Sequence, residues 1–453
     1  MIVTLWYDRI DWLNGWCQEY QDALKNQFNW NEQLIEYFHH CSSQELLQLS
    51  GLQWLVKPID EFEEGGVHIY TMSLPQLIPS NHWGGPIHSF RNISEKAKQL
   101  IREGKLTLYI SGDREGWPCS RYMKSLLTAI REAGFEHCEI YHSTGNVDWQ
   151  DDWEEWKSAN LELVGNFAFA GVFSHDYFER LTCSYYLLRI SPDPQQIHDE
   201  TERTRNFLSF NRMARPHRFA LYSEVLRNNL LDNSFFSFHG VMPWNKYTSE
   251  NVPVEPTCYS EIVNHIFNNY KEKNDWLDKC ISEELIVKRT IDYNEENIPG
   301  LFAYANETQG LYDNSYFSLI SETLFVEPGR FITEKTYKSL FAGHPFIFIG
   351  QSGILRLLKE HGYKTFPEMF DESYDDIEDH SERFNAVINE VIKFCNKSDE
   401  EKQEIYKTVL PSIEHNQKLF FSDTRKHAWQ KQVQSMLAKI GKTDEENLDK
   451  NKT

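Results

Sequence analysis

Short apolar runs alternate with amphipathic segments along most of the chain, and this alternation predicts an α/β fold. In the first half the strand-like runs lie at residues 2–7, 67–72, 106–112, 138–144 and 185–191. Between two of these runs, apolar residues recur at intervals of three and four, as on one face of a helix: Met123, Leu126, Leu127 and Ile130. Alternating strands and helices are typical of parallel strands joined by crossover helices.

The second half repeats this rhythm, and a polar, turn-rich stretch at 192–205 separates the two halves. Its predicted strands lie at 207–211, 235–240, 316–321 and 344–350. Its predicted helices lie at 217–229, 258–273, 334–342, 351–362, 381–395 and beyond residue 400. We therefore expect two doubly wound α/β domains, at 1–195 and 207–425, with a linker at 196–206 and a C-terminal helix and disordered tail at 426–453.

The composition is that of a soluble globular protein, and it narrows the range of partners. The 453 residues are 40% apolar and carry a net charge of −22, which argues against broad non-specific binding to nucleic acids. The sequence has no run that could span a membrane, no start typical of a signal peptide, and no Cys-x-x-Cys pair among its eight cysteines. These features predict a protein of the reducing cytoplasm, or of the host cytoplasm if its source is a virus.

One stretch, FITEKTYKSLFAGHPFIFIG at 331–350, combines a helix start, a helix end and a buried strand. Thr333 is a good N-cap, Glu334 places negative charge in the first turn, and Gly343 suits the helix end. The N-terminus of such a helix lies beyond the carboxyl end of a strand, where ligands bind in open α/β sheets. It favours an anion such as a diphosphate, which Lys335 could neutralise, and Glu334 could accept hydrogen bonds from sugar hydroxyls. The alternative is a capping glutamate beside a lysine that faces solvent.

Three arginines form a second candidate anion site, directly after the predicted strand at 207–211. Arg212, Arg215 and Arg218 lie in the segment NRMARPHR, at the start of the next predicted helix. Guanidinium groups at such a junction attract phosphate, because they present several donors in a fixed plane. In a chain as acidic as this one, their clustering at one strand end favours a binding site over ordinary surface arginines.

The residues around these two clusters resemble the donor domain of GT-B glycosyltransferases. The segment SETLFVEPGRFITEKTYKSLFAGHPFIFIG is most similar to the alpha-1,3-fucosyltransferase and exostosin-like pattern, in which Thr-Glu-Lys opens a helix before an apolar strand. Upstream, FLSFNRMARPHRFALYSEVL is similar to the first strand and helix of that domain, and its Arg-Pro-His-Arg resembles segments of viral and bacterial glycosyltransferases. The resemblance covers residues 207–350. It implies two Rossmann-like domains facing a cleft, with the acceptor bound by 1–195 and a nucleotide-sugar donor by 207–425.

The resemblance also assigns roles to individual residues. Lys335 would contact the donor phosphates, Glu334 a ribose or sugar hydroxyl, and Arg218 the leaving diphosphate. Glu322 and Thr323 would lie at the edge of the donor, where the fucosyltransferase pattern has Glu-Asn. This departure leaves the donor sugar open, and GDP-fucose is not assigned.

The same resemblance implies an inverting transfer to an acceptor hydroxyl, with no cofactor beyond the nucleotide sugar and no essential metal. The Glu-x7-Glu signature of many retaining enzymes is absent, because six residues separate Glu327 from Glu334, and no clear apolar-Asp-x-Asp motif of metal-dependent enzymes is found. The catalytic base would come from the first domain. We expect Asp113, which follows a predicted strand, or else His88, since an imidazole titrates near neutral pH. His142, in another predicted strand, is a third candidate, and Asp113 could equally form a turn.

Two other functions remain open on the sequence. A phage-type enzyme of the same fold could glycosylate a modified DNA base. Arg114, Arg121 and Lys124 would then contribute contacts, although the net negative charge favours a glycan or small-molecule acceptor. A protein that binds nucleotide sugars or carbohydrate without catalysis would keep the donor site and lack a base. If the chain is an enzyme, replacement of Lys335 by alanine should abolish turnover.

Overall fold

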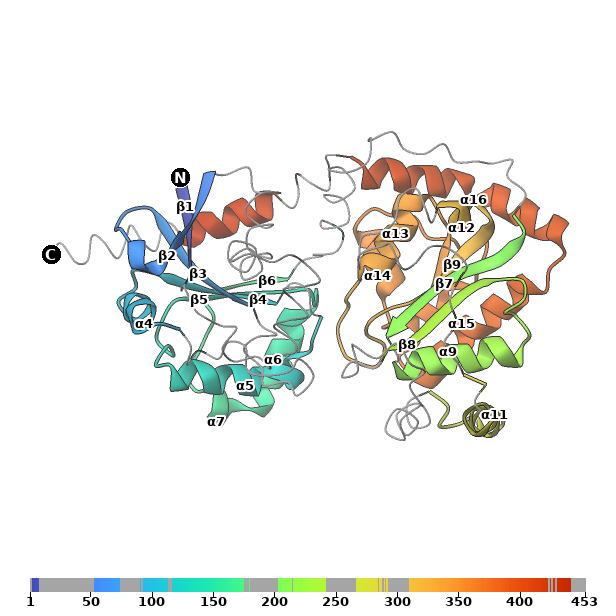
Figure 1. Ribbon diagram of the computed structural model, residues 1–453, viewed down its shortest axis with the longest axis horizontal. Helices are drawn as coiled ribbons and strands as arrows, with labels where there is room; N and C mark the ends of the chain where they lie inside the picture. The colour runs from blue at the N-terminus through green and yellow to red at the C-terminus, as the bar shows by residue number, and fades with distance from the viewer. Residues whose placement is uncertain are drawn as a thin grey trace, which may run out of the picture. The chain divides into compact units, whose positions relative to one another are not determined.

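The chain forms two compact units, each built around a parallel sheet (Figure 1). The computed structural model describes residues 2–7, 53–73, 90, 93–112, 116–174, 179, 203–213, 215–241, 266–283, 285–286, 289, 291, 309–422, 424, 427 and 430–440. The first unit comprises Met1–Asp176 and Thr424–Thr453, and the second comprises Tyr177–Asp423. The prediction of an α/β fold with two Rossmann-like, doubly wound domains is confirmed.

The sheet of the first unit has the strand order β2-β1-β3-β4-β5-β6, and its described strands all run parallel. They are β1 (Ile2–Tyr7), β2 (Gln53–Pro58), β3 (Val67–Ser73), β4 (Thr107–Gly112), β5 (Ile140–Thr144) and β6 (Gly171–Ser174). The helices are α4 (Glu95–Arg102), α5 (Cys119–Glu132), α6 (Trp149–Ala159) and α7 (Leu161–Val164), with a 3-10 turn at Ile59–Glu61. Sequence patterning missed β2 and β6. Both are edge strands with half-exposed or exposed residues, so their apolar signal is weak.

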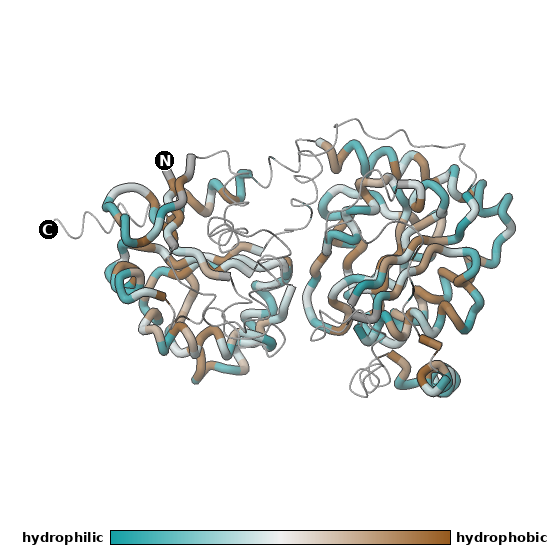
Figure 2. The backbone as a smooth tube through the Cα atoms, viewed as in Figure 1, coloured by the Kyte–Doolittle hydropathy of each residue, from teal (hydrophilic) through white to brown (hydrophobic). Residues whose placement is uncertain are grey.

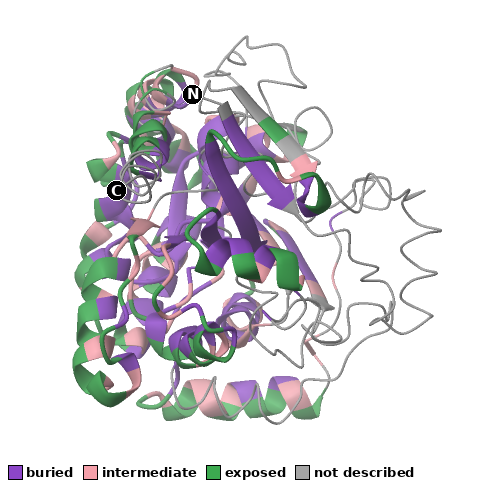
Figure 3. Cartoon of the chain, turned by 90° about the vertical axis from the view of Figure 1, so that its left-hand side faces the viewer, coloured by how far each residue is buried: buried purple, intermediate pink, exposed green. Residues whose placement is uncertain are grey.

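Both faces of this sheet are covered, because side chains alternate along each strand. Trp6, Leu108 and Ile110 point to one face, where they pack with apolar residues of α4, α5 and α6. Leu5 and Tyr109 point to the other, against Val433, Met436, Leu437 and Ile440 of the helical residues 430–440. Figure 3 shows the strands of this unit mostly buried, while its helices also carry exposed residues. The C-terminal helix therefore completes the core of the first unit.

The sheet of the second unit has the strand order β10-β9-β7-β8, again with its described strands parallel. They are β7 (Arg205–Met213), β8 (Phe235–Val241), β9 (Ser315–Ser321) and β10 (Phe346–Ile349). The helices are α9 (Pro216–Arg227), α11 (Lys271–Ser282), α12 (Gln309–Asp313), α13 (Glu334–Ala342), α14 (Ile354–Glu360), α15 (His380–Cys395) and α16 (Asp399–Phe420), with a 3-10 turn at Glu372–Asp376. Figure 1 shows α13 and α16 on one side of this sheet and α9 and α15 on the other, and Figure 2 shows the apolar strands between them.

The predicted helix at 258–273 is wrong over residues 266–270, which form turns, and α11 begins only at Lys271. Apolar residues there, such as Ile266 and Phe267, are buried in the core without helical backbone. The predicted strand at 185–191 lies outside the described residues. In the part of the chain that the structure describes, no helix is long and apolar enough to cross a membrane.

The strand order places a topological switch point in each sheet. In the second unit the chain passes from β7 to β8 on one side and then to β9 and β10 on the other, so the switch lies between β7 and β9. Ligands of open α/β sheets bind outside the carboxyl ends of the strands at such a point. In the first unit the equivalent point lies between β1 and β3. The segments that follow those two strands lie outside the described residues.

Candidate functional site

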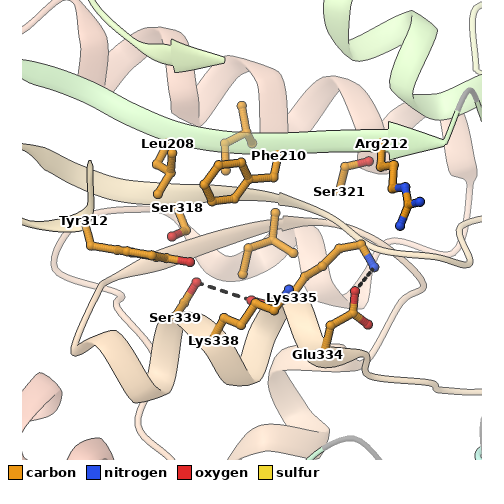
Figure 4. A pocket seen from close by; sticks show the side chains of 12 residues that line it. Leu208, Phe210, Arg212, Tyr312, Ser318, Ser321, Glu334, Lys335, Lys338 and Ser339 are labelled. Carbon is orange, nitrogen blue, oxygen red and sulfur yellow. Dashed lines mark hydrogen bonds and ion pairs between the residues drawn. The ribbon is translucent and has the colours of Figure 1, made fainter. Parts of the chain in front are cut away.

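A pocket of about 120 Å³ lies at the switch point of the second unit, between β7, β9 and α13 (Figure 4). Alternation along β7 brings Phe210 and Arg212 to the face that lines it. In Figure 4, Arg212, Glu334 and Lys335 lie at one end of the pocket, and Tyr312 and Ser318 lie at the other. The pocket therefore has a charged end and an end that carries hydroxyl groups.

The charged end contains the predicted Glu334–Lys335 pair. Thr333 is the N-cap of α13, and its hydroxyl accepts from the Lys335 backbone N–H, as the sequence predicted. Lys335 Nζ lies 3.0 Å from Glu334 Oε1 and donates to Thr333 Oγ1 at 3.0 Å. Burial pushes the pKa of Glu334 upward, but Lys335 and Lys338 outweigh that effect and lower it to about 2. Glu334 is thus a carboxylate at neutral pH, and Lys335 is held in the pocket wall rather than extending into solvent.

Lys338, which the sequence patterns did not predict as a site residue, lines the same pocket one helical turn further along α13. Only 7% of Lys338 is exposed. Burial lowers the pKa of Lys338 from 10.5 to about 8, against the opposing charges of Glu334 and Glu322. With Arg212 and Lys335, this gives three cationic groups against one carboxylate among the described residues that line the pocket. Such an excess of positive charge around one pocket favours an anionic ligand.

Glu322 lies directly after β9 and next to the charged end of the pocket, and its carboxylate is fully buried. It accepts four hydrogen bonds: from the backbone N–H of Thr323 and of Thr333, at 3.2 Å each, from Thr333 Oγ1 at 2.5 Å and from Thr336 Oγ1 at 2.6 Å. These bonds tie the end of β9 to the first turn of α13. Thr323 also contacts the Glu334–Lys335 pair, because its hydroxyl accepts from Lys335 Nζ at 3.3 Å. The structure thus gives Glu322 a positioning role.

The three arginines take different places. Arg212 is exposed and lines the pocket, and Arg215 is the half-buried N-cap residue of α9. Arg218 is only 2% exposed, and its guanidinium donates to the carbonyl oxygens of Ser321 at 3.1 Å and Glu322 at 3.3 Å. Burial, followed by the charge of Arg215, lowers the pKa of Arg218 to about 9. Arg218 therefore holds the carboxyl end of β9, and its contact with a diphosphate stays a prediction.

The predicted bases lie in the first unit. Asp113 and His88 lie outside the described residues. His142 is described and is fully buried in β5, where its Nδ1 donates to the carbonyl of Ile110 at 2.9 Å and its Nε2 accepts from the Tyr122 hydroxyl at 3.0 Å. Trp149 Nε1 in turn donates to that hydroxyl at 2.7 Å. Both ring nitrogens are used within the core, so His142 is a structural residue and not a base.

Two pocket residues that were not predicted, Lys338 and Ser339, could have been found from their spacing in the sequence. Lys338 and Ser339 follow Glu334 and Lys335 by four residues each, so all four lie on one face of α13. Ser318 carried no comparable signal, because a serine in an apolar strand is unremarkable until the pocket beside it is seen.

The whole chain was also compared with known proteins. No family model and no curated protein matches it. A solved structure of a UDP-forming α,α-trehalose-phosphate synthase from Burkholderia xenovorans is similar over 97% of this chain and 98% of that chain, with 7% identical residues and a TM-score of 0.35.

Proposed function

We propose that the chain is a nucleotide-sugar-dependent glycosyltransferase of the GT-B type, and that the pocket at the β7–β9 switch point is part of its donor site. The observation that carries this proposal is the charge of that pocket. Among the described residues that line it, Arg212, Lys335 and Lys338 are cationic and lie around the N-terminal half of α13, and Glu334 is the one carboxylate. A helix N-terminus with added cations suits a diphosphate, and a carboxylate beside it suits a sugar hydroxyl.

Positively charged side chains would stabilise the transition state of the transfer. As the glycosidic bond to the nucleotide breaks, negative charge grows on the diphosphate, and preorganised cations lower the barrier by stabilising that charge. Lys335 and Arg212 would contact the leaving group directly. Glu322 and Arg218 would act indirectly, since their hydrogen bonds fix the strand end and the helix start. The pocket is smaller than the usual range of about 300–1,000 Å³ for ligand sites, so it would hold one part of the donor.

A ligand screen tests the donor site. Thermal unfolding would be followed with UDP-, GDP-, CMP- and dTDP-sugars, and with free UDP and GDP, each with and without EDTA. A ligand at 100 times its dissociation constant adds about 2.7 kcal/mol of stability. We expect one nucleotide family to raise the unfolding temperature regardless of EDTA, as a metal-independent enzyme requires. A screen in which no nucleotide has an effect would contradict the proposal.

Catalysis requires a second test, because a binding protein would pass the first. We propose that Asp113, or His88 in its place, removes the proton of the acceptor hydroxyl, and that the transfer inverts the anomeric configuration. Asp113→Asn and His88→Ala should keep nucleotide affinity, and the substitution of the true base should abolish turnover. NMR of the product formed from an α-linked donor should show a β-linkage. Retention of turnover in both variants would remove these residues from the mechanism.

A further inference from the structure

The end of the pocket away from the charged groups has its own chemistry. Leu208, Phe210 and Tyr312 form apolar walls there, and the hydroxyl of Ser318 lies among them (Figure 4). A sugar ring carries hydroxyls around its whole circumference, and apolar walls would leave several of them without partners, which is costly in a buried space. A flat heterocycle has apolar faces and carries its polar groups on its edge. These walls therefore suit a heterocycle better than a sugar.

The neighbouring His344 fixes what Ser318 can do. His344 Nε2 lies 2.9 Å from the carbonyl oxygen of Ser315, which can only accept, so the proton is on Nε2. Burial lowers the pKa of His344 to about 3, so the ring is neutral and its Nδ1 is an acceptor. Ser318 Oγ lies 2.8 Å from that Nδ1 and must donate its proton to it. The lone pairs of Ser318 remain for a ligand, which must therefore supply a donor.

Lys338 supplies the complementary group. Its ammonium is a donor only, and it lines the same pocket as Ser318. A ligand edge that carries an N–H next to a carbonyl or ring nitrogen could donate to Ser318 and accept from Lys338. Nucleobases have such edges.

The volume of the pocket limits the size of that base. An engineered protein cavity of about 150 Å³ takes up benzene, which is a single six-membered ring. The present pocket has about 120 Å³, which accommodates one ring and not the fused two-ring system of a purine. Leu208 and Phe210 form one wall of the pocket. They belong to β7, a central strand, so this wall cannot shift to enlarge the pocket without disturbing the sheet.

We propose that this inner end binds a pyrimidine base, and that the donor is a pyrimidine rather than a purine nucleotide sugar. The inference rests on the proposed function and specifies the substrate class of the same site. Ser318 then selects the ligand by accepting from the base, which fills the pocket, and the phosphates lie beyond the base at the charged end, beside Arg212 and Lys335.

Isothermal titration of the full chain with UDP, CDP, GDP, ADP and inorganic pyrophosphate tests this inference. UDP or CDP should bind at least about tenfold more tightly than either purine nucleotide, since loss of one hydrogen bond or poor fit costs about that factor. Ser318→Ala should weaken the preferred pyrimidine nucleotide about tenfold and leave pyrophosphate affinity unchanged. Ser282→Ala, on the exposed surface of α11, is the matched control and should change neither.

The outcomes separate the two proposals. GDP or ADP binding as tightly as UDP and CDP would overturn the pyrimidine assignment and leave the glycosyltransferase proposal intact. Equal pyrimidine affinity in Ser318→Ala and in the unmodified chain would remove Ser318 from recognition. Absence of binding by every nucleotide would overturn the proposed function itself. The comparison among nucleotides uses the unmodified protein, so it does not depend on the folding of a variant.

Discussion

The Thr336 hydroxyl donates to Glu322 Oε1 at 2.6 Å. This bond joins the residue directly after β9 to the first turn of α13. Thr333 adds two further bonds to the same carboxylate. The pocket residues Glu334 and Lys335 lie between these two threonines in sequence. Their positions therefore depend on a buried carboxylate that does not itself line the pocket.

Glu322→Gln should lower the free energy of unfolding by about 2–3 kcal/mol. The amide nitrogen of glutamine would face hydroxyl and N–H groups that need an acceptor, so buried donors would lose their partners. Urea denaturation measures the change. Glu404→Gln, on the exposed surface of α16, is the control and should have almost no effect. An unchanged unfolding free energy in Glu322→Gln would mean that the carboxylate does not hold α13.

Relative to Lys338→Met, the diphosphate affinity of the unmodified chain should fall as the pH rises through about 8, because Lys338 then loses its proton and its attraction for the anion. Titration with pyrophosphate from about pH 7 to 9.5 measures this change in affinity. In Lys338→Met the affinity should be lower at pH 7, and the part of the pH dependence that Lys338 causes should disappear. Lys359→Met, an exposed lysine of α14, is the control and should keep the dependence. The same dependence in Lys338→Met would assign it to another group.

The effect of Lys338 on stability has the opposite sign. The pKa of Lys338 is about 8 in the folded chain and 10.5 as its ordinary value, so between these values the unfolded chain binds a proton that the folded chain lacks. The contribution of this group to the free energy of unfolding therefore rises with pH across that window. Below about pH 8 the cost of burying the charged amine is fully present. Lys338→Met should remove this rise, which pH-dependent denaturation would detect.

His142→Phe should lower the free energy of unfolding by about 1–3 kcal/mol and leave the pH profile of turnover unchanged. The phenyl ring leaves the Tyr122 hydroxyl without its acceptor and the Ile110 carbonyl without its donor. Hydrolysis of the nucleotide sugar, followed across pH, gives the profile. Loss of the profile without loss of stability would restore His142 as a candidate base.

Gly343→Ala should destabilise the second unit by about 1–2 kcal/mol or more. Gly343 ends α13 with φ at 63°, and an added Cβ would lie 2.5 Å from Gln417 Nε2. Gly310→Ala in α12 meets no atom within 4 Å and should be neutral or slightly stabilising, because alanine is the better helix former. Thermal unfolding of the two variants compares them directly, and equal stability would contradict the structural account of this helix end.

Local signals predicted much of this fold, because its elements follow from short-range pattern. The apolar face of α5, the Thr333 cap and the Gly343 helix end all depend on residues within one or two turns. Edge strands β2 and β6 were missed, since a strand with one unpaired side buries less apolar surface.

Long-range contacts could not be predicted in the same way. Glu322 was expected at the edge of the donor, and its bonds to two threonines more than ten residues away could not be read from the sequence. His142 was a candidate base, although aromatic groups surround it in the core. Residues 430–440 pack on the sheet of the first unit, whose strands lie far earlier in the sequence. Ser318 became significant only through its bond to His344 and its place in the pocket wall.

The most direct test of the account compares nucleotide-sugar binding by the unmodified chain with binding by Lys335→Ala. We expect isothermal titration to identify one nucleotide-sugar family as a ligand, and the variant to lose about 10- to 150-fold in affinity, the value of a hydrogen bond to a charged group. Lys407→Ala, on the exposed surface of α16, should bind as the unmodified chain does. Equal affinity in Lys335→Ala, or no binding of any nucleotide sugar by the unmodified chain, would contradict the proposed donor site.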